Sequence, residues 1–221
     1  MKKSILFLFA GLLMPICLNA QEREEPRFLF SEGNLFLSGF GGPLAEFTLI
    51  GNDFALCNGG GGAFLVNQTF FFGGYGMGLS TSHYRDDMKD ITGIDHPKLY
   101  FNHSGLWLGY IHNHFKPIHP ALSVKLGGGE ISLTDIYFHT TPFDERKGVD
   151  KVFVVTPQIE VEMNFTPWMK MNVGAGYRFV SGVDRLYQVT GHDPEMYYNA
   201  GDFSTPFLNL GFYFGWFNQS K

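Results

Sequence analysis

The sequence predicts an all-β fold: a transmembrane antiparallel up-and-down β-barrel of eight strands that follows a cleaved signal peptide. Three observations lead to this prediction: an export-type leader, strand-sized blocks whose connectors alternate between short and long, and strict alternation of large apolar residues within the blocks. Strands of a bacterial membrane barrel join by tight turns on one side of the membrane and by longer loops on the other. The connectors therefore predict the orientation of the barrel as well as its fold: the short turns face the periplasm and the long loops face outward.

The leader is residues 1–20. Lys2 and Lys3 precede an apolar run, and the segment ends at Ala20 before a charged stretch, which is the layout of an export signal cleaved near Ala20. The apolar run is too short for the roughly 20 residues that a membrane-spanning helix requires. We expect residues 21–33 to form a periplasmic segment ahead of the barrel.

The rest of the sequence excludes two classes of protein. After the leader, no apolar run approaches the roughly 18 residues of a membrane helix, so a helical membrane protein is excluded. Removing Lys2 and Lys3 from the 16 basic residues leaves 14 against 21 acidic residues, a net charge of −7. We expect no nucleic-acid partner, because such a partner would require a basic surface.

Eight blocks have the length and composition of strands. The predicted strands are 34–49, 54–66, 70–80, 99–114, 120–133, 151–164, 168–181 and 206–217. The short connectors are 67–69, 115–119 and 165–167, and the long polar connectors are about 81–98, 134–150 and 182–205. The barrel then spans 34–217, with 218–221 as a C-terminal tail. Gly41, Gly42 and Pro43 interrupt the first block, and a turn there would raise the count to ten strands.

The last strand predicts the face that meets lipid. Large apolar residues alternate along it with Asn209, Gly211, Tyr213 and Gly215. The expected lipid-facing wall is Leu208, Leu210, Phe212, Phe214 and Trp216. A soluble β-sandwich is the alternative, since it would bury such a wall against a second sheet. The glycine-rich and ionisable opposite face favours the barrel, whose narrow lumen is polar.

Charged residues on the inward face predict a polar network inside the barrel. If the hairpin at 165–167 is symmetrical, Glu162 and Lys170 lie opposite each other as a cross-strand ion pair. Buried charges persist only when they are paired. We therefore expect a lumen network of Glu160, Glu162, Lys170, Arg178 and Lys125. This network would fill the lumen as a plug or, alternatively, line a narrow pathway for small solutes.

Aromatic residues predict the two membrane interfaces. Trp168 and Trp216 fall on the side of the short turns, whereas Tyr187, Tyr197 and Tyr198 belong to an opposite, long connector. Tryptophan and tyrosine are enriched at the headgroup level of membrane proteins. We expect these residues to form the two girdles.

These features together resemble the small outer-membrane β-barrel family of Gram-negative bacteria, the eight-stranded OmpA-type and OmpX-type barrels. The resemblance covers about residues 34–217 and rests on the leader, the glycine and aromatic strands, the tight turns and the aromatic last strand. It implies a location in the outer membrane, insertion by the outer-membrane assembly machinery and a plugged or very narrow lumen. One departure is the C-terminus, where family members commonly end on an aromatic residue and Phe217 is followed by 218–221.

Two chemical sites are weighed and not expected. His112, His114 and His119 cluster around one turn, as the ligands of a metal site do, but no carboxylate or cysteine accompanies them locally. We predict no metal and no cofactor.

A lipid-modifying enzyme would need a nucleophile beside its base. His103 and Ser104 are consecutive on a strand, so they point to opposite faces. We therefore expect no enzyme. The expected role is structural or surface-interacting, with outer-membrane lipid as a partner; an accessory subunit docked on another outer-membrane protein is a further alternative.

Overall fold

The computed structural model describes residues 35–89, 93–134, 147–184, 186–187, 195–196 and 198–217. The predicted signal peptide (1–20), the periplasmic segment (21–33) and the tail (218–221) lie outside the described residues. The barrel belongs to a compact unit, 36–221, and the account below concerns that unit.

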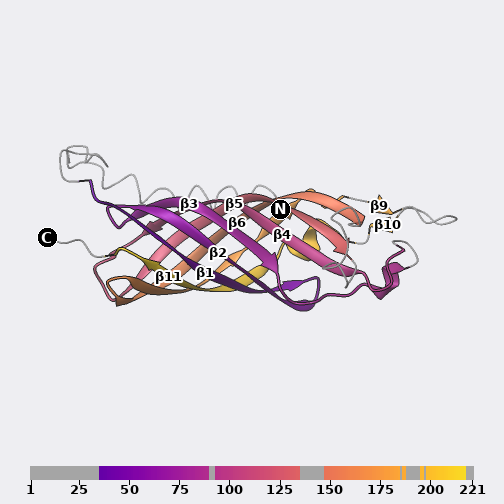
Figure 1. The fold of residues 1–221 in the computed structure, drawn as a ribbon, viewed down its shortest axis with the longest axis horizontal. Helices are drawn as coiled ribbons and strands as arrows, with labels where there is room; N and C mark the ends of the chain where they lie inside the picture. Colours follow the sequence, from indigo (N-terminus) through magenta and orange to yellow (C-terminus); the bar gives the residue numbers. More distant parts are fainter. Residues whose placement is uncertain are drawn as a thin grey trace, which may run out of the picture. The chain divides into compact units, whose positions relative to one another are not determined.

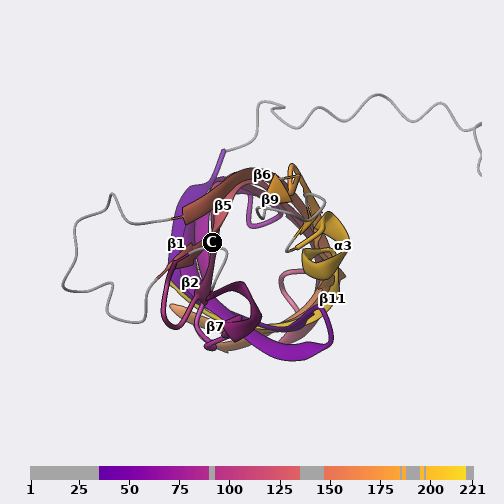
Figure 2. The ribbon, with the colours of Figure 1, turned by 90° about the vertical axis from the view of Figure 1, so that its right-hand side faces the viewer.

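The strands form one closed antiparallel ring, drawn from the side in Figure 1 and along its axis in Figure 2. The ring runs β1-β2-β3-β4-β5-β6-β7-β11 and closes because β11 also pairs with β1. The strands are β1 (Leu37–Ile50), β2 (Asp53–Val66), β3 (Phe70–Leu79), β4 (Lys98–Ile111), β5 (Ile118–Thr134), β6 (Lys147–Thr166), β7 (Met169–Tyr177), β8 (Phe179–Ser181) and β11 (Pro206–Gly215). The predicted barrel is confirmed, and the soluble sandwich is wrong.

Strand β8 continues β7, because both strands pair with β6. Gln158 of β6 pairs with Gly176 and Val155 pairs with Phe179, which is one uninterrupted register. The ladder is interrupted opposite Pro157, which has no N–H to donate. β7 and β8 therefore count as one strand of an eight-stranded barrel.

Strand β1 continues through the predicted break. Gly41 pairs with Gly62 and Pro43 with Gly60, without a shift in register. The pairing of β1 with β11 skips Gly42 and Pro43 and resumes in the same register at Leu44. Pro43 thus interrupts one ladder of a continuous strand, and the ten-strand alternative is wrong.

The two ends of the barrel differ in their connectors. The turn end carries the short connections 67–69, 112–117 and 167–168, and the loop end carries the long ones after β3, β5 and β8. One loop-end connection is also short, because Gly51, at φ 59°, and Asn52 alone join β1 to β2. The left-handed conformation at Gly51 is one that glycine adopts without steric cost.

Short secondary-structure elements lie in the connectors of the loop end. They are the 3₁₀ turn η2 (Asp86–Met88), the helix α3 (Ala200–Phe203) and the short pair β9 (Leu186–Tyr187) and β10 (Glu195–Met196). Among the described residues, no helix is long and apolar enough to cross a membrane.

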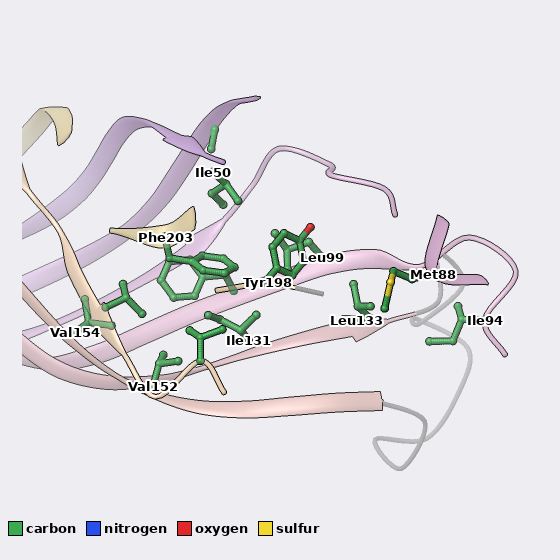
Figure 3. Packing of buried hydrophobic residues seen from close by; sticks show 14 residues of the cluster. Ile50, Met88, Ile94, Leu99, Ile131, Leu133, Val152, Val154, Tyr198 and Phe203 are labelled. Atoms are coloured by element: carbon green, nitrogen blue, oxygen red, sulfur yellow. The ribbon is translucent and has the colours of Figure 1, made fainter. Parts of the chain in front are cut away.

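Two apolar clusters fill the interior, one toward each end. The loop-end cluster includes Phe101, Ile131, Tyr198 and Phe203 (Figure 3). The turn-end cluster surrounds Trp107, whose ring lies 5.7 Å from Phe40, 5.1 Å from Phe71 and 5.6 Å from Tyr213.

Glycines on the inner face make room for this aromatic cluster. A methyl group at Gly61 would lie 3.0 Å from the Trp107 ring, and one at Gly109 would overlap the Phe71 ring. An eight-stranded barrel is just wide enough for side chains to fill it. The glycine-rich inner face therefore accommodates large side chains and does not line an open space.

Candidate functional site

Polar and charged side chains fill the barrel between and beside the two apolar clusters. Along β6 the buried residues alternate with outward ones, so that Gln158, Glu160 and Glu162 all point inward. The same alternation buries Lys125 on β5 and Lys170 on β7, and Arg178 is buried between β7 and β8. All five residues predicted for the lumen network thus lie inside the barrel.

The centre of the interior is organised around Glu46 on β1, which is completely buried. Its Oε1 accepts a hydrogen bond from Lys125 Nζ at 2.8 Å, and its Oε2 lies 3.7 Å from Arg178 Nη1. Arg178 also donates from Nε to the carbonyl oxygen of Phe203 at 3.1 Å. One carboxylate therefore faces two cations, Lys125 from the opposite strand β5 and Arg178 from between β7 and β8.

Hydrogen bonds extend this central group to Glu160. Lys125 Nζ donates to Gln158 Oε1 at 3.3 Å, and Gln158 Nε2 donates to Glu160 Oε1 at 2.7 Å. Ser123 Oγ donates to Glu160 Oε2 at 2.9 Å, and Asn209 Nδ2 donates to Glu160 Oε1 at 3.1 Å. Lys125, Glu160 and Arg178 thus share one network through Glu46 and Gln158.

A second group lies at the turn end. Lys170 Nζ is 3.0 Å and His119 Nε2 is 3.1 Å from Glu162 Oε2, and all three side chains are buried. His119 Nδ1 donates to the carbonyl oxygen of Lys116 at 2.9 Å. The Lys170 ammonium also lies 4.5 Å from the centre of the Phe217 ring, within the range of a cation–π interaction.

The predicted register of this ion pair is wrong, although the pair itself forms. Glu162 lies opposite Asn172, and Lys170 lies opposite Asn164, because the hairpin turns at 167–168 and not symmetrically about 165–167. The long lysine side chain reaches the carboxylate along the diagonal of the hairpin. Diagonal neighbours on one face of a sheet are within reach of long side chains.

Sequence reasoning missed three inward residues. Glu46 was overlooked because the neighbouring break at 41–43 obscured the alternation of β1. His119 is one of three histidines clustered around a turn in the sequence, but it is buried and paired with Glu162. Trp107 lies in a stretch that alternates poorly, and its indole N–H donates to Ser123 Oγ at 3.2 Å inside the barrel.

The two chemical sites weighed from the sequence do not come together. The described residues contain no group of three or more His, Cys, Asp or Glu placed to hold a metal ion. His112 is exposed and bonds to Tyr110 and Asn113, away from the buried His119. His103 is buried and bonds to the Tyr75 hydroxyl at 3.1 Å, whereas Ser104 is exposed on the outer face.

The outer face carries the predicted apolar wall. Leu208 is 61% and Trp216 is 69% exposed, Phe214 is also exposed, and Leu210 and Phe212 are half-buried between neighbours. Trp168 stacks on Phe214 with ring centres 6.1 Å apart.

The second predicted girdle is wrong in one member. Tyr198 is buried and packs on Phe203 with ring centres 5.3 Å apart. The side chains of Tyr187 and Tyr197 lie outside the described part of the chain. Exposed aromatic residues do occur toward the loop end, where Tyr177 and Phe179 are in contact on the outer face.

Comparisons with known proteins agree with this geometry. No family model and no curated protein matches the sequence. Among solved structures, the chain is similar to Neisserial surface protein A, with a TM-score of 0.55 and 10% identity over 82% of this chain and 99% of that one. The fold is that of an eight-stranded outer-membrane β-barrel.

Two other solved structures give lower scores. The attachment invasion locus protein Ail of Yersinia pestis, solved with the heparin analogue sucrose octasulfate, has a TM-score of 0.45 and 9% identity, covering 81% of this chain and 97% of that one. A major outer membrane protein from Thermus thermophilus has a TM-score of 0.47 and 9% identity, covering 81% and 99%. At such identities, structural similarity concerns the fold alone.

Proposed function

We propose that this chain is an integral outer-membrane β-barrel with a structural or surface-interaction role and a plugged lumen. The observation that carries the proposal is the filled interior, in which two apolar clusters flank a network of paired charges. Catalysis is not part of the proposal, and the pair weighed from the sequence, His103 and Ser104, lies on opposite faces of β4.

The outward side chains support placement in a membrane. Leu208, Ile159 and Phe64 are each more than 60% exposed, on three different strands. A water-soluble monomer rarely exposes an apolar surface that continues around the molecule, whereas lipid stabilises such a band on a closed barrel. Outer-membrane lipid is therefore the proposed partner of the wall, and the outer-membrane assembly machinery is the proposed route of insertion.

The packing of the interior favours a plugged lumen and not an open pore. A pathway for small solutes would need a continuous polar lining wide enough for water. Here Trp107 and Phe203, both with no exposed surface, belong to the apolar clusters toward opposite ends of the barrel. The central charged groups are directed at one another, as in the contacts of Glu46 with Lys125 and Arg178, so the charges are paired without solvent.

Planar-bilayer recording of the purified full chain tests the plug. The expected result is no steady conductance, both for the natural chain and for Lys170→Ala. A steady conductance of the natural chain that Lys170→Ala abolishes would instead support the narrow pore and overturn the plug.

Location is tested separately. The chain is expected in the outer-membrane fraction, with residues of the loop end accessible to a membrane-impermeant label on intact cells. Recovery in the soluble periplasmic fraction would contradict membrane insertion. Co-purification of one abundant outer-membrane protein after mild detergent extraction would support the alternative role of an accessory subunit.

A further inference from the structure

The loop end carries a polar pocket that the plugged barrel does not use. Its volume is about 600 Å³, within the range of small-molecule sites. The walls come from the β1–β2 turn, from the segment after β3 and from the segment around α3. Three connectors that are far apart in the sequence thus enclose one space at the end of the barrel.

The floor of this pocket is part of the buried core. Ile50 and Tyr198 line the pocket and also belong to the loop-end apolar cluster. The β1–β2 turn is attached to the α3 segment by the Gly51 N–H, which donates to the carbonyl oxygen of Asp202 at 2.9 Å. A pocket built on packed side chains holds its shape without a ligand, which favours binding.

The charges of the lining favour a cation. Asp53 and Asp202 are acidic, and Arg85 is the basic residue among the lining residues. The Arg85 guanidinium lies over the Tyr198 ring, 4.7 Å from its centre. Burial lowers the pKa of His83 below its usual 6.5, with Asp53 acting in the opposite direction. With His83 neutral at pH 7, the lining carries one net negative charge.

Asp53 is the group best placed to anchor a ligand. It is exposed in the pocket wall, and its carboxylate makes no hydrogen bond or ion pair with the residues that the structure describes. Tyr84 lines the same pocket and is 46% exposed. A carboxylate beside an open aromatic face suits an ammonium group, which is attracted to both.

We propose that this pocket binds a small polyhydroxylated ligand that carries a primary ammonium group. The ammonium group lies against Asp53, the body of the ligand packs on Tyr84, and its hydroxyls bond to polar lining residues such as Asn52 and Ser82. The inference deepens the surface-interaction role and rests on it, because a ligand outside the cell reaches the pocket only if the loop end faces outward.

Glucosamine and N-acetylglucosamine form a matched pair of probes, since acetylation removes the charge and leaves the sugar ring. Titration calorimetry of the full chain in detergent, at slightly acidic pH, is expected to give a dissociation constant of about 1 mM for glucosamine, as typical for a dozen heavy atoms. N-acetylglucosamine is expected to bind at least about tenfold more weakly. Equal binding of both sugars, or no saturable binding of glucosamine, overturns the proposal.

Two variants locate the binding. Asp53→Asn keeps the shape of the side chain and is expected to weaken glucosamine binding by about tenfold. Asp95→Asn is the matched control, because Asp95 lies in the same connector as His83 and Tyr84 but pairs with Lys89 at 2.8 Å outside the pocket lining. Unchanged binding by Asp53→Asn, or an equal loss in Asp95→Asn, places the ligand elsewhere and overturns the site.

The outcome can be separated from the proposed function. Heat-dependent mobility in SDS gels reports the folded barrel of each variant, and fractionation with surface labelling reports its location and direction. A folded, outward-facing barrel that does not bind glucosamine overturns the pocket alone. A barrel that binds glucosamine in detergent but whose loop end is not accessible on cells overturns the surface role alone.

Discussion

The two halves of the barrel interior are filled with different chemistry. Strands β1 to β4 contribute mostly glycines and aromatic rings, with Gly61 and Gly109 leaving space for Trp107 and Phe71. Strands β5, β6, β7 and β11 contribute most of the buried polar groups. They include His119, Ser123, Lys125, Gln158, Glu160, Glu162, Lys170, Asn172 and Asn209.

The difference shows two ways to fill a space of fixed width. An aromatic ring fills it by volume and requires a glycine where it meets the facing wall, because interiors are close-packed. A charged side chain fills it only if a partner of opposite charge meets it. Two sets of contacts join the halves. Glu46 of the first half meets Lys125 and Arg178 of the second, and Trp107 of the first half bonds to Ser123 of the second.

The largest effect is expected from breaking the ionic junction. Glu46→Leu leaves Lys125 and Arg178 without their shared carboxylate, and loss of one partner of a buried pair costs about 3–5 kcal/mol. Urea-induced unfolding of the barrel in lipid vesicles measures this loss. Asp53→Leu, at an exposed carboxylate, is the control and should change the free energy of unfolding little. A loss below about 1 kcal/mol in Glu46→Leu would show that the junction does not hold the halves together.

Overpacking the aromatic half should have the next largest effect. Gly109→Ala places a methyl group against the Phe71 ring, and insertion of one methyl group into a packed core costs about 1–3 kcal/mol. Gly76→Ala is the matched control, because its added carbon would lie 3.8 Å from the nearest atom, Ser104 Cβ. Equal stability of the two variants would mean that the glycines are not required by the aromatic rings.

Removing the hydrogen-bonded junction should have a smaller effect. Ser123→Ala deletes the acceptor of the Trp107 indole N–H and a donor to Glu160, for a loss of about 1–2 kcal/mol. Unfolding measurements give the loss, and the tryptophan emission should shift as the indole environment changes. Ser104→Ala, on the outer face, serves as the control; an equally large loss there would contradict a specific role for Ser123.

The smallest effect is expected outside the barrel interior. A hydrogen bond from Lys89 and its charge lower the pKa of Asp95, and both groups are exposed. A lowered pKa stabilises the folded chain above the usual carboxyl pKa, and this stabilisation is lost as the pH falls through the lowered value. Lys89→Ala should return the Asp95 pKa toward 3.8, as followed by NMR titration. An unchanged pKa would show that this surface pair does not form in solution.

Much of the fold followed from the sequence. The eight strands, their antiparallel up-and-down order and the outward wall of β11 were predictable, because alternation with period two and connector length are local properties of the chain. The break at 41–43 was ambiguous for a physical reason. A proline removes one hydrogen-bond donor, and only the neighbouring strands decide whether the ladder continues past it, as β2 does opposite Pro43.

The pairing of charged side chains inside the barrel was less predictable. The five charged residues of β5 to β8 could be assigned to the inner face from alternation alone. Their partners could not, because Glu46 meets Lys125 across 79 residues of sequence and His119 meets Glu162 across 43. The pocket at the loop end was equally hidden, since Asp53 begins β2 whereas Tyr84 and Tyr198 come from two long connectors.

The sequence by itself determined that this chain is a barrel with an apolar outside and a polar, glycine-rich inside. The tertiary structure decided what the inside is: a filled interior in which the glycines accommodate aromatic rings and every buried Glu described above meets a hydrogen-bond donor. The reason is that side-chain alternation is fixed along one strand, whereas closure of the ring sets which side chains face one another across it.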